Sequence, residues 1–246
     1  MKKRLASALL LLTALVASLS TRENAQVANP PSRGLREPVS TGNIQCDRNW
    51  LSTRSANLIS PSGITASVEL RGKMLVGKTT DDSRCETTWI LHLAGKGTSQ
   101  TIVLDTRDDE LYYEHVFEMD GWSRNGSLLL LSQILTAGDW DETTPLVYDI
   151  QNHRMWRIEL APLFDKFAPK DCPVYFRAMG FTSPGKIMLD VGSLDQNDPS
   201  PGEKPCFQNS VWELDYTQKR VAKVSDNHTF VSFGTVSGKR SSPSRE

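Results

Sequence analysis

The chain has 246 residues, of which 38% are hydrophobic and 23% charged, a composition that excludes disorder of the whole and fits one or two globular domains. The formal net charge is −1, and the chain has no basic stripe. This excludes nucleic acids and polybasic contact with membrane surfaces, because both depend on clustered Lys and Arg.

The N-terminus has the features of a secretory signal. Lys2-Lys3-Arg4 precede a mostly apolar stretch, Leu5 to Leu19, which is shorter than the roughly 20 residues of a membrane span. We predict a signal peptide over residues 1–25 and no membrane span after its removal. Its loss leaves 28 − 4 = 24 bases and 29 − 1 = 28 acids, a net charge of −4. The expected location is secreted or periplasmic.

The exported part is predicted to form one β domain. Residues 26–42 are rich in Pro, Ser, Arg and Glu and are expected to be a flexible leader. The domain covers residues 43–235, and its first stretch, Ile44 to Ser60, has no regular pattern. Residues 236–246 are polar and are expected to be a disordered tail.

The first predicted unit begins at Ile64, where apolar and polar residues alternate as far as Leu70. Arg71-Gly72 is interpreted as a turn into a second strand, Lys73 to Gly77. A polar loop leads to a third strand, Trp89 to Leu93. A glycine-containing turn then leads to a fourth, Thr101 to Asp105.

A second unit repeats this order. Its four short apolar runs are 116–119, 128–131, 146–150 and 155–160, with a turn at Ser123 to Gly126 and a loop at Gly138 to Glu142. These runs predict one antiparallel sheet with two apolar faces. Such a sheet is not stable alone, so other elements must pack on both sides of it.

The order recurs a third time after a short segment that Pro162 and Pro169 bound as a turn or two of helix. The third set of runs is 174–180, 186–191, 211–215 and 220–224. The turn glycines Gly72, Gly126 and Gly185 are 54 and 59 residues apart, which indicates repeated units. Thr229 to Phe233 is expected to return to the first unit and close a ring.

Two motifs resemble those of a known family. The turn Thr182-Ser183-Pro184-Gly185-Lys186 before an apolar strand, and the strand and hairpin from Val147 to His153, resemble the TolB-like and WD-like β-propeller repeats over about residues 60–225. The resemblance implies a propeller-like array of four-stranded antiparallel sheets, which closes if Ile44 to Ser60 and the C-terminal strand supply a degenerate fourth blade. The alternative is a β-sandwich or barrel.

All four cysteines lie in the exported part, and an even number in an oxidising compartment predicts two disulfides. Three pairings are possible. We favour the sequential one, Cys46–Cys85 and Cys172–Cys206, because each pair then falls within one unit and its leading segment. A zinc site is disfavoured because no C-x-x-C pair occurs.

Three sequence motifs have ordinary structural explanations. Residues 72–79 match the phosphate-binding loop pattern, but Met74-Leu75-Val76 is typical of a strand interior. Ser123 lies between glycines in a hairpin turn rather than a nucleophile elbow. The four histidines are scattered, and His153 is predicted to be solvated in a turn.

The best candidate site lies in the loops between the second and third strands, which should emerge on one face. Converging carboxylates there would bind Ca²⁺ or a basic partner. Trp140 is either a cap over the core or an exposed recognition residue. The candidate residues are Asp81, Asp82, Asp139, Trp140, Asp141, Glu142, Asp195 and Asp198.

These patterns favour a non-catalytic, exported, monomeric protein that binds a protein or a cell-envelope component through its loops, with no cofactor other than a possible Ca²⁺. One alternative is an exported hydrolase, resembling a glycosidase or a peptidase, in which Asp139, Asp141 and Asp195 supply the acid and the base. A further alternative is a structural module stabilised by Ca²⁺.

Overall fold

The computed structural model describes residues 39–40, 51–75, 84–95, 97–109, 114–137, 140–193, 205–238 and 244–245. All of them belong to one compact unit, Gly34–Glu246. Their only helix is the short α1 (Ala161–Phe164). The prediction of an all-β protein is therefore confirmed for the part of the chain that is described.

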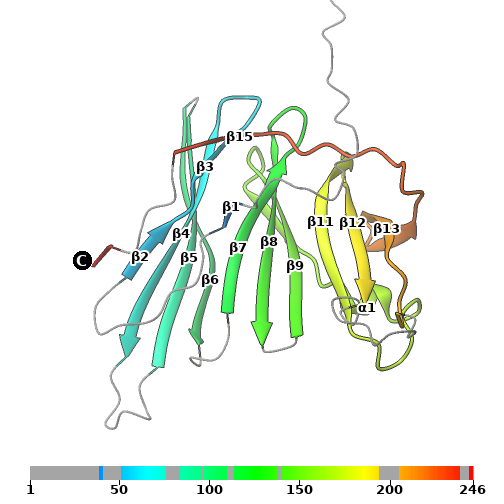
Figure 1. The fold of residues 1–246 in the computed structure, drawn as a ribbon. Coiled ribbons are helices and arrows are strands. Elements are labelled where there is room, and N and C mark those ends of the chain that lie inside the picture. The colour runs from blue at the N-terminus through cyan, green and yellow to red at the C-terminus, as the bar shows by residue number, and fades with distance from the viewer. Residues whose placement is uncertain are drawn as a thin grey trace, which may run out of the picture. The chain divides into compact units, whose positions relative to one another are not determined.

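Three antiparallel sheets follow one another along the chain (Figure 1). The first sheet contains β2 (Leu51–Arg54), β3 (Asn57–Ile59), β4 (Thr65–Leu75), β5 (Arg84–Gly95) and β6 (Thr98–Asp109). The middle sheet contains β7 (Glu114–Trp122), β8 (Leu128–Ala137), β9 (Trp140–Asp149) and β10 (Arg154–Arg157). The third sheet contains β11 (Val174–Ser183), β12 (Lys186–Ser193), β13 (Ser210–Asp215) and β14 (Arg220–Lys223).

Short strands from the two ends of this unit add to these sheets. Strand β1 (Val39–Ser40) pairs with β7, although it lies in the predicted flexible leader. Strands β15 (Thr235–Ser237) and β16 (Ser244–Arg245) pair with β3 and β2, so parts of the predicted disordered tail are also strands. Backbone pairing at sheet edges orders these segments despite their polar composition.

The first unit differs from the prediction in where its strands begin. No turn occurs at Arg71-Gly72, because β4 continues through both residues and Gly72 pairs with Leu51 and Thr87. The first strand is instead the segment from β2 to β3, which the sequence left unassigned. Both pair with β4, and they are separated only by residues 55–56.

The turn that leads into β4 is Ser60-Pro61-Ser62-Gly63. The Gly63 amide donates to the Ser60 carbonyl at 2.9 Å, and Gly63 has a φ of 82°, which favours glycine. In the turn from Ser123 to Gly126, the Gly126 amide likewise donates to the Ser123 carbonyl, at 2.9 Å. The repeated turn glycines are therefore Gly63, Gly126 and Gly185, with Gly63 in place of Gly72.

The middle sheet is covered on both faces, as its apolar pattern predicts. Neighbouring residues of a strand point to opposite faces. Leu129 and Leu131 of β8 pack against the first sheet, whereas Leu130 packs against the third, and all three are fully buried. The three sheets are therefore packed face to face, with one apolar core on each side of the middle sheet.

The first sheet turns a polar face away from the middle sheet. On β4, Ser67, Glu69 and Arg71 alternate with the core residues. Burial alone would raise the pKa of Glu69, but hydrogen bonds from Arg71, Ser52 and His92 lower it to about 2. On the third sheet, Glu213 similarly alternates with core residues and binds Lys186 at 2.6 Å. Both outer sheets thus have one apolar and one polar face.

Residues 230–237, here called the C-terminal strap, cross all three sheets at one edge (Figure 1, top). Every second residue of the strap, at positions 231, 233 and 235, pairs with a residue of a different sheet. Each of these partner residues lies four residues before a turn glycine. The pairs are Val231 with Phe181, Phe233 with Trp122, and Thr235 with Ile59.

The first two strap pairs exchange both backbone hydrogen bonds, at 2.7 to 3.0 Å. The residues expected to return, Thr229 to Phe233, therefore pair with the third and middle sheets. The chain reaches the first sheet only at Thr235. Trp122 adds a further link between sheets, because its indole N–H donates to the Leu58 carbonyl at 3.2 Å.

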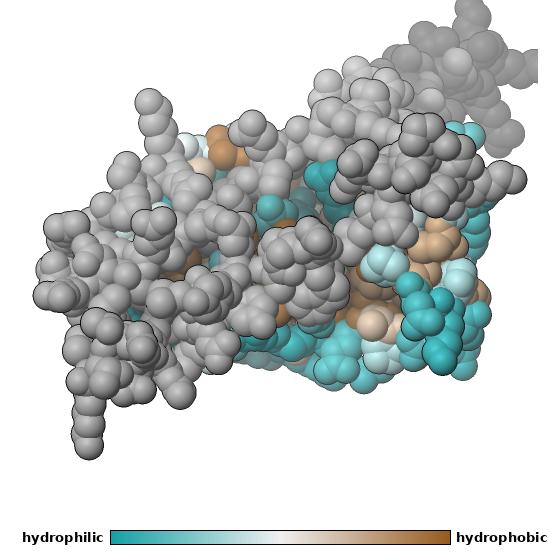
Figure 2. Space-filling model, turned by 60° about the horizontal axis from the view of Figure 1, so that its bottom comes forward, coloured by the Kyte–Doolittle hydropathy of each residue, from teal (hydrophilic) through white to brown (hydrophobic). Residues whose placement is uncertain are grey.

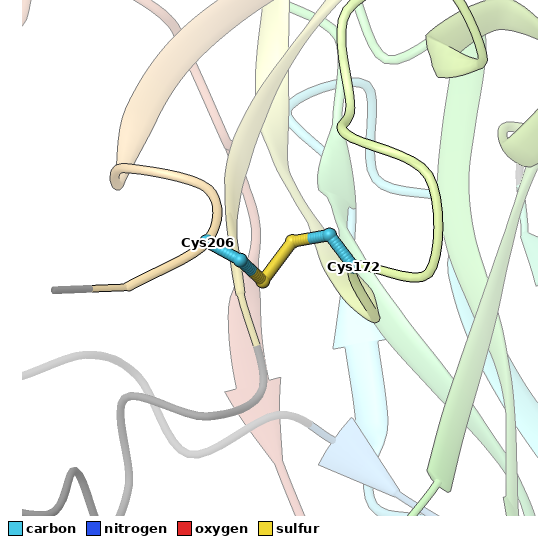
Figure 3. The surroundings of a disulfide bond; sticks show 2 residues. All are labelled: Cys172 and Cys206. Atoms are coloured by element: carbon cyan, nitrogen blue, oxygen red, sulfur yellow. A yellow bond between two sulfur atoms is a disulfide. The ribbon is translucent and has the colours of Figure 1, made fainter. Parts of the chain in front are cut away.

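The predicted disulfide Cys172–Cys206 is present, with 5.8 Å between the two Cα atoms (Figure 3). Cys172 lies in the segment between the middle and third sheets, before β11, and Cys206 lies before β13. The disulfide therefore joins these two segments. The predicted pair Cys46–Cys85 lies outside the residues whose side chains are described. A disulfide of this kind forms and persists in oxidising compartments.

Candidate functional site

Strands β4, β8 and β12 all end at the same edge, opposite the C-terminal strap (Figure 1, bottom). We call this edge the loop edge. The second strands of the three sheets therefore end on one side, and the loops that follow them (76–83, 138–139 and 194–204) lie outside the described residues. Figure 2 turns this edge toward the viewer. On its right, over the third sheet, hydrophilic and hydrophobic surface lie side by side. Phe167, which follows α1, is 39% exposed.

Most of the predicted acidic residues fall outside the described part of the chain, namely Asp81, Asp82, Asp139, Asp195 and Asp198. The backbone of Trp140, Asp141 and Glu142 belongs to β9. The predicted loop at Gly138 to Glu142 is therefore only a two-residue connection. Of the side chains of these three residues, only that of Glu142 is described, and it is exposed. Within the described residues, no group of three or more acidic, His or Cys side chains is placed to hold a metal ion.

A polar cluster that the sequence did not indicate lies between the first and middle sheets, near the loop edge. We call it the His115 cluster, and its members come from five strands. They are Trp89, Asp105, Arg107, His115, Gln133 and Arg157. His115 is buried because it shares the face of β7 that carries Phe117 and Met119.

Hydrogen bonds fix the orientation of the Gln133 amide. Its Nε2 donates to Asp105 Oδ2 at 2.8 Å, and its Oε1 accepts from Arg157. A carboxylate only accepts and a guanidinium only donates, so the amide cannot be flipped. The 2.6 Å contact between Gln133 Nε2 and His115 Nε2 is then a bond that the histidine accepts.

The tautomer of His115 follows from that bond. The pKa of His115 is lowered from 6.5 to about 4, mainly by burial and then by the charge of Arg107. The Asp105 carboxylate raises the pKa, and the charge of Arg157 lowers it. The ring is therefore neutral at pH 7. Because Nε2 accepts a hydrogen bond, the single ring proton is on Nδ1.

Two donors of the cluster have no acceptor. Neither His115 Nδ1 nor Trp89 Nε1 has a hydrogen-bond partner among the described residues. The two residues are 4% and 1% exposed, and their ring centroids are 4.0 Å apart. Buried polar groups in native proteins are nearly always hydrogen-bonded, so these two N–H groups mark a place where an acceptor fits.

The opposite face of β7 carries two carboxyl groups, Glu118 and Asp120. Burial raises the pKa of Asp120 well above its usual range. The hydrogen bond from Ser132 Oγ lowers this pKa, the nearby Glu118 carboxylate raises it, and the charge of Arg177 lowers it. Burial also raises the pKa of Glu118, against the charge of Arg177. Strand β7 thus carries ionisable groups on both faces.

One signal in the sequence could have indicated His115. The alternation through residues 115–119 places the histidine on the same face as Phe117 and Met119, which predicts burial. His153, in contrast, lies exposed in a turn as predicted. The turn at Ser123 joins β7 to β8, which confirms a hairpin, and residues 72–75 of the phosphate-loop match lie within β4.

No protein-family model and no curated protein matches the chain. Among the helices of the described residues, none is long and apolar enough to cross a membrane.

Proposed function

We propose that this is an exported, propeller-like binding protein that recognises a protein or a cell-envelope component through its loop edge. The observation that carries the proposal is that β4, β8 and β12 end at the same edge of the three sheets. Loops that a rigid sheet scaffold holds together are the usual place for binding residues.

Two features support a rigid loop edge. The disulfide Cys172–Cys206 joins the segment before β11 to the segment before β13, which restrains both. The strap pairs with all three sheets at the opposite edge, so the sheets are fixed to one another there. The disulfide also supports export, because disulfides persist outside the reducing cytoplasm.

The propeller-like arrangement is proposed from the repeated plan. Each sheet has four consecutive antiparallel positions, and each first strand has an equivalent residue at or near its end that pairs with the strap. The polar outer faces of the first and third sheets act as caps, as terminal repeats do in other repeat proteins.

A pull-down with matched variants tests the function. The mature protein is immobilised and exposed to an envelope extract from its own host, and captured proteins and glycans are identified. The loop-edge variant is Asp141→Ala with Glu142→Ala. The control variant is Arg124→Ala with Gln151→Ala, two exposed residues in turns at the strap edge.

The expected result is one component that the wild type and the control retain and the loop-edge variant loses. Equal retention by both variants would place binding elsewhere and contradict the proposal. A known complex added to the extract serves as the positive control. If that complex is recovered but the wild type captures nothing, the proposal is contradicted as well.

A further inference from the structure

We propose that Trp89 and His115 form a binding site for one small monovalent anion, a halide or a carboxylate, between the first and middle sheets. The site is separate from the partner-binding loops, and it does not depend on the function proposed above. It is built from the His115 cluster.

Both groups at this site are donors. The indole Nε1–H of Trp89 can only donate, and the bond from Gln133 to His115 Nε2 leaves the proton on His115 Nδ1. The two rings are in contact, with centroids 4.0 Å apart, and we take one occupant beside them to reach both N–H groups. An occupant must therefore accept two hydrogen bonds and does not need to donate any.

The surrounding charges favour an anion over water. Arg107 is neutralised by Asp105, which lies 2.9 Å from its Nε. Arg157 donates only to neutral acceptors, the Gln133 side chain and, at 3.2 Å, the Leu104 carbonyl. Among the described residues, no carboxylate forms an ion pair with Arg157, so the cluster carries an excess of one positive charge.

The position of the cluster provides access from the loop edge. His115 is the second residue of β7 and lies near the loop edge, whereas Arg157, the last residue of the short β10, pairs with Leu146 within β9. Both arginines are partly exposed, whereas the two donors are buried. Their guanidinium groups would attract an anion toward the donors.

The halide and the carboxylate share the same recognition chemistry, so the test includes both. The mature protein is labelled with ¹⁵N and titrated with sodium chloride or sodium formate, and sodium sulfate keeps the ionic strength constant. The measured signals are the Trp89 indole N–H and the His115 ring nitrogens. Trp89→Phe, or through-bond correlations where that variant does not fold, identifies the indole signal among the six tryptophans.

We expect a saturable downfield shift of the Trp89 indole proton with at least one of the two salts. Saturation by chloride alone would assign a halide site, and saturation by formate alone a carboxylate site. Arg157→Gln should weaken binding about tenfold or more, because it removes the uncompensated charge. Arg154→Gln, on the same strand but over the Trp156 ring, should leave the affinity unchanged.

Three results would overturn the proposal. One is an indole signal that neither salt shifts. Another is equal affinity in Arg157→Gln and Arg154→Gln, which would show that the charge is irrelevant. The last is a His115 Nδ1 proton shifted upfield regardless of salt, which would show that it donates to the Trp89 ring instead.

Discussion

Replacing Gly121 with alanine is expected to lower the free energy of unfolding by about 3–5 kcal/mol, because this residue touches the C-terminal strap. Gly121 has a φ of 147°, which side chains rarely adopt, and an added Cβ would lie 2.1 Å from Ser232 Oγ. The backbone strain costs about 1–3 kcal/mol. Displacing Ser232 also breaks its bond to the Asp120 carbonyl and weakens the neighbouring Trp122–Phe233 pair, at about 1 kcal/mol for each lost hydrogen bond.

A matched control separates the strap contact from backbone strain. Gly97 also has a positive φ, 77°, but an added Cβ there meets no atom within 4 Å. Gly97→Ala should therefore cost only about 1–2 kcal/mol. Urea unfolding followed by tryptophan fluorescence measures both variants, and equal losses would refute the assigned role of the strap.

A double variant provides a second check. Ser232→Ala removes the hydroxyl that would collide with the new methyl group, so its cost should not add to that of Gly121→Ala. We expect the combined loss to fall short of the sum by about 1 kcal/mol. Strict additivity would mean that the two residues do not touch in solution.

Other predictions concern buried groups and the disulfide. Because His115 has a folded pKa of about 4 against 6.5, the unfolded state binds more protons between these values. Stability is therefore full above pH 6.5 and falls by about 3 kcal/mol as the pH drops to 4. His115→Gln should flatten that part of the stability curve, and an unchanged slope would contradict the buried neutral ring. Asp120→Asn should raise the melting temperature at pH 7, because burial disfavours ionisation of the Asp120 carboxyl group and an amide can still accept from Ser132; a lower melting temperature would count against it. Replacing Cys172 and Cys206 with serine should cost about 3–4 kcal/mol for a separation of 34 residues, measured by thermal melting; a loss below about 1 kcal/mol would show that the bond does not restrain the unfolded chain.

The sequence predicted the middle and third sheets better than the first for a physical reason. In the middle sheet, Leu129 to Leu131 form an apolar run because both faces are covered. In β4, the outer face is polar, so Arg71 and Gly72 looked like a turn although they lie within a strand. The true turn at Ser60 was hidden because the strand before it is broken into two short pieces.

The His115 cluster could not be predicted because its members come together only when two sheets pack. Gln133 is 18 residues from His115 and 24 from Arg157, and no spacing in the sequence brings them together. The alternation of β7 could predict that His115 is buried, but not which residues it contacts. The pairing Cys172–Cys206, in contrast, was accessible, because the two residues flank one predicted sheet.

The order in which the chain is synthesised gives the strap a further consequence. Residues 230–237 leave the ribosome after strands β1 to β14, which include the four consecutive positions of each sheet. A chain interrupted before Val231 would contain all three sheets but none of the backbone that connects their ends. Prematurely terminated copies would therefore remain loosely assembled and open to proteases, and the strap would serve the cell as a check that translation has passed this point.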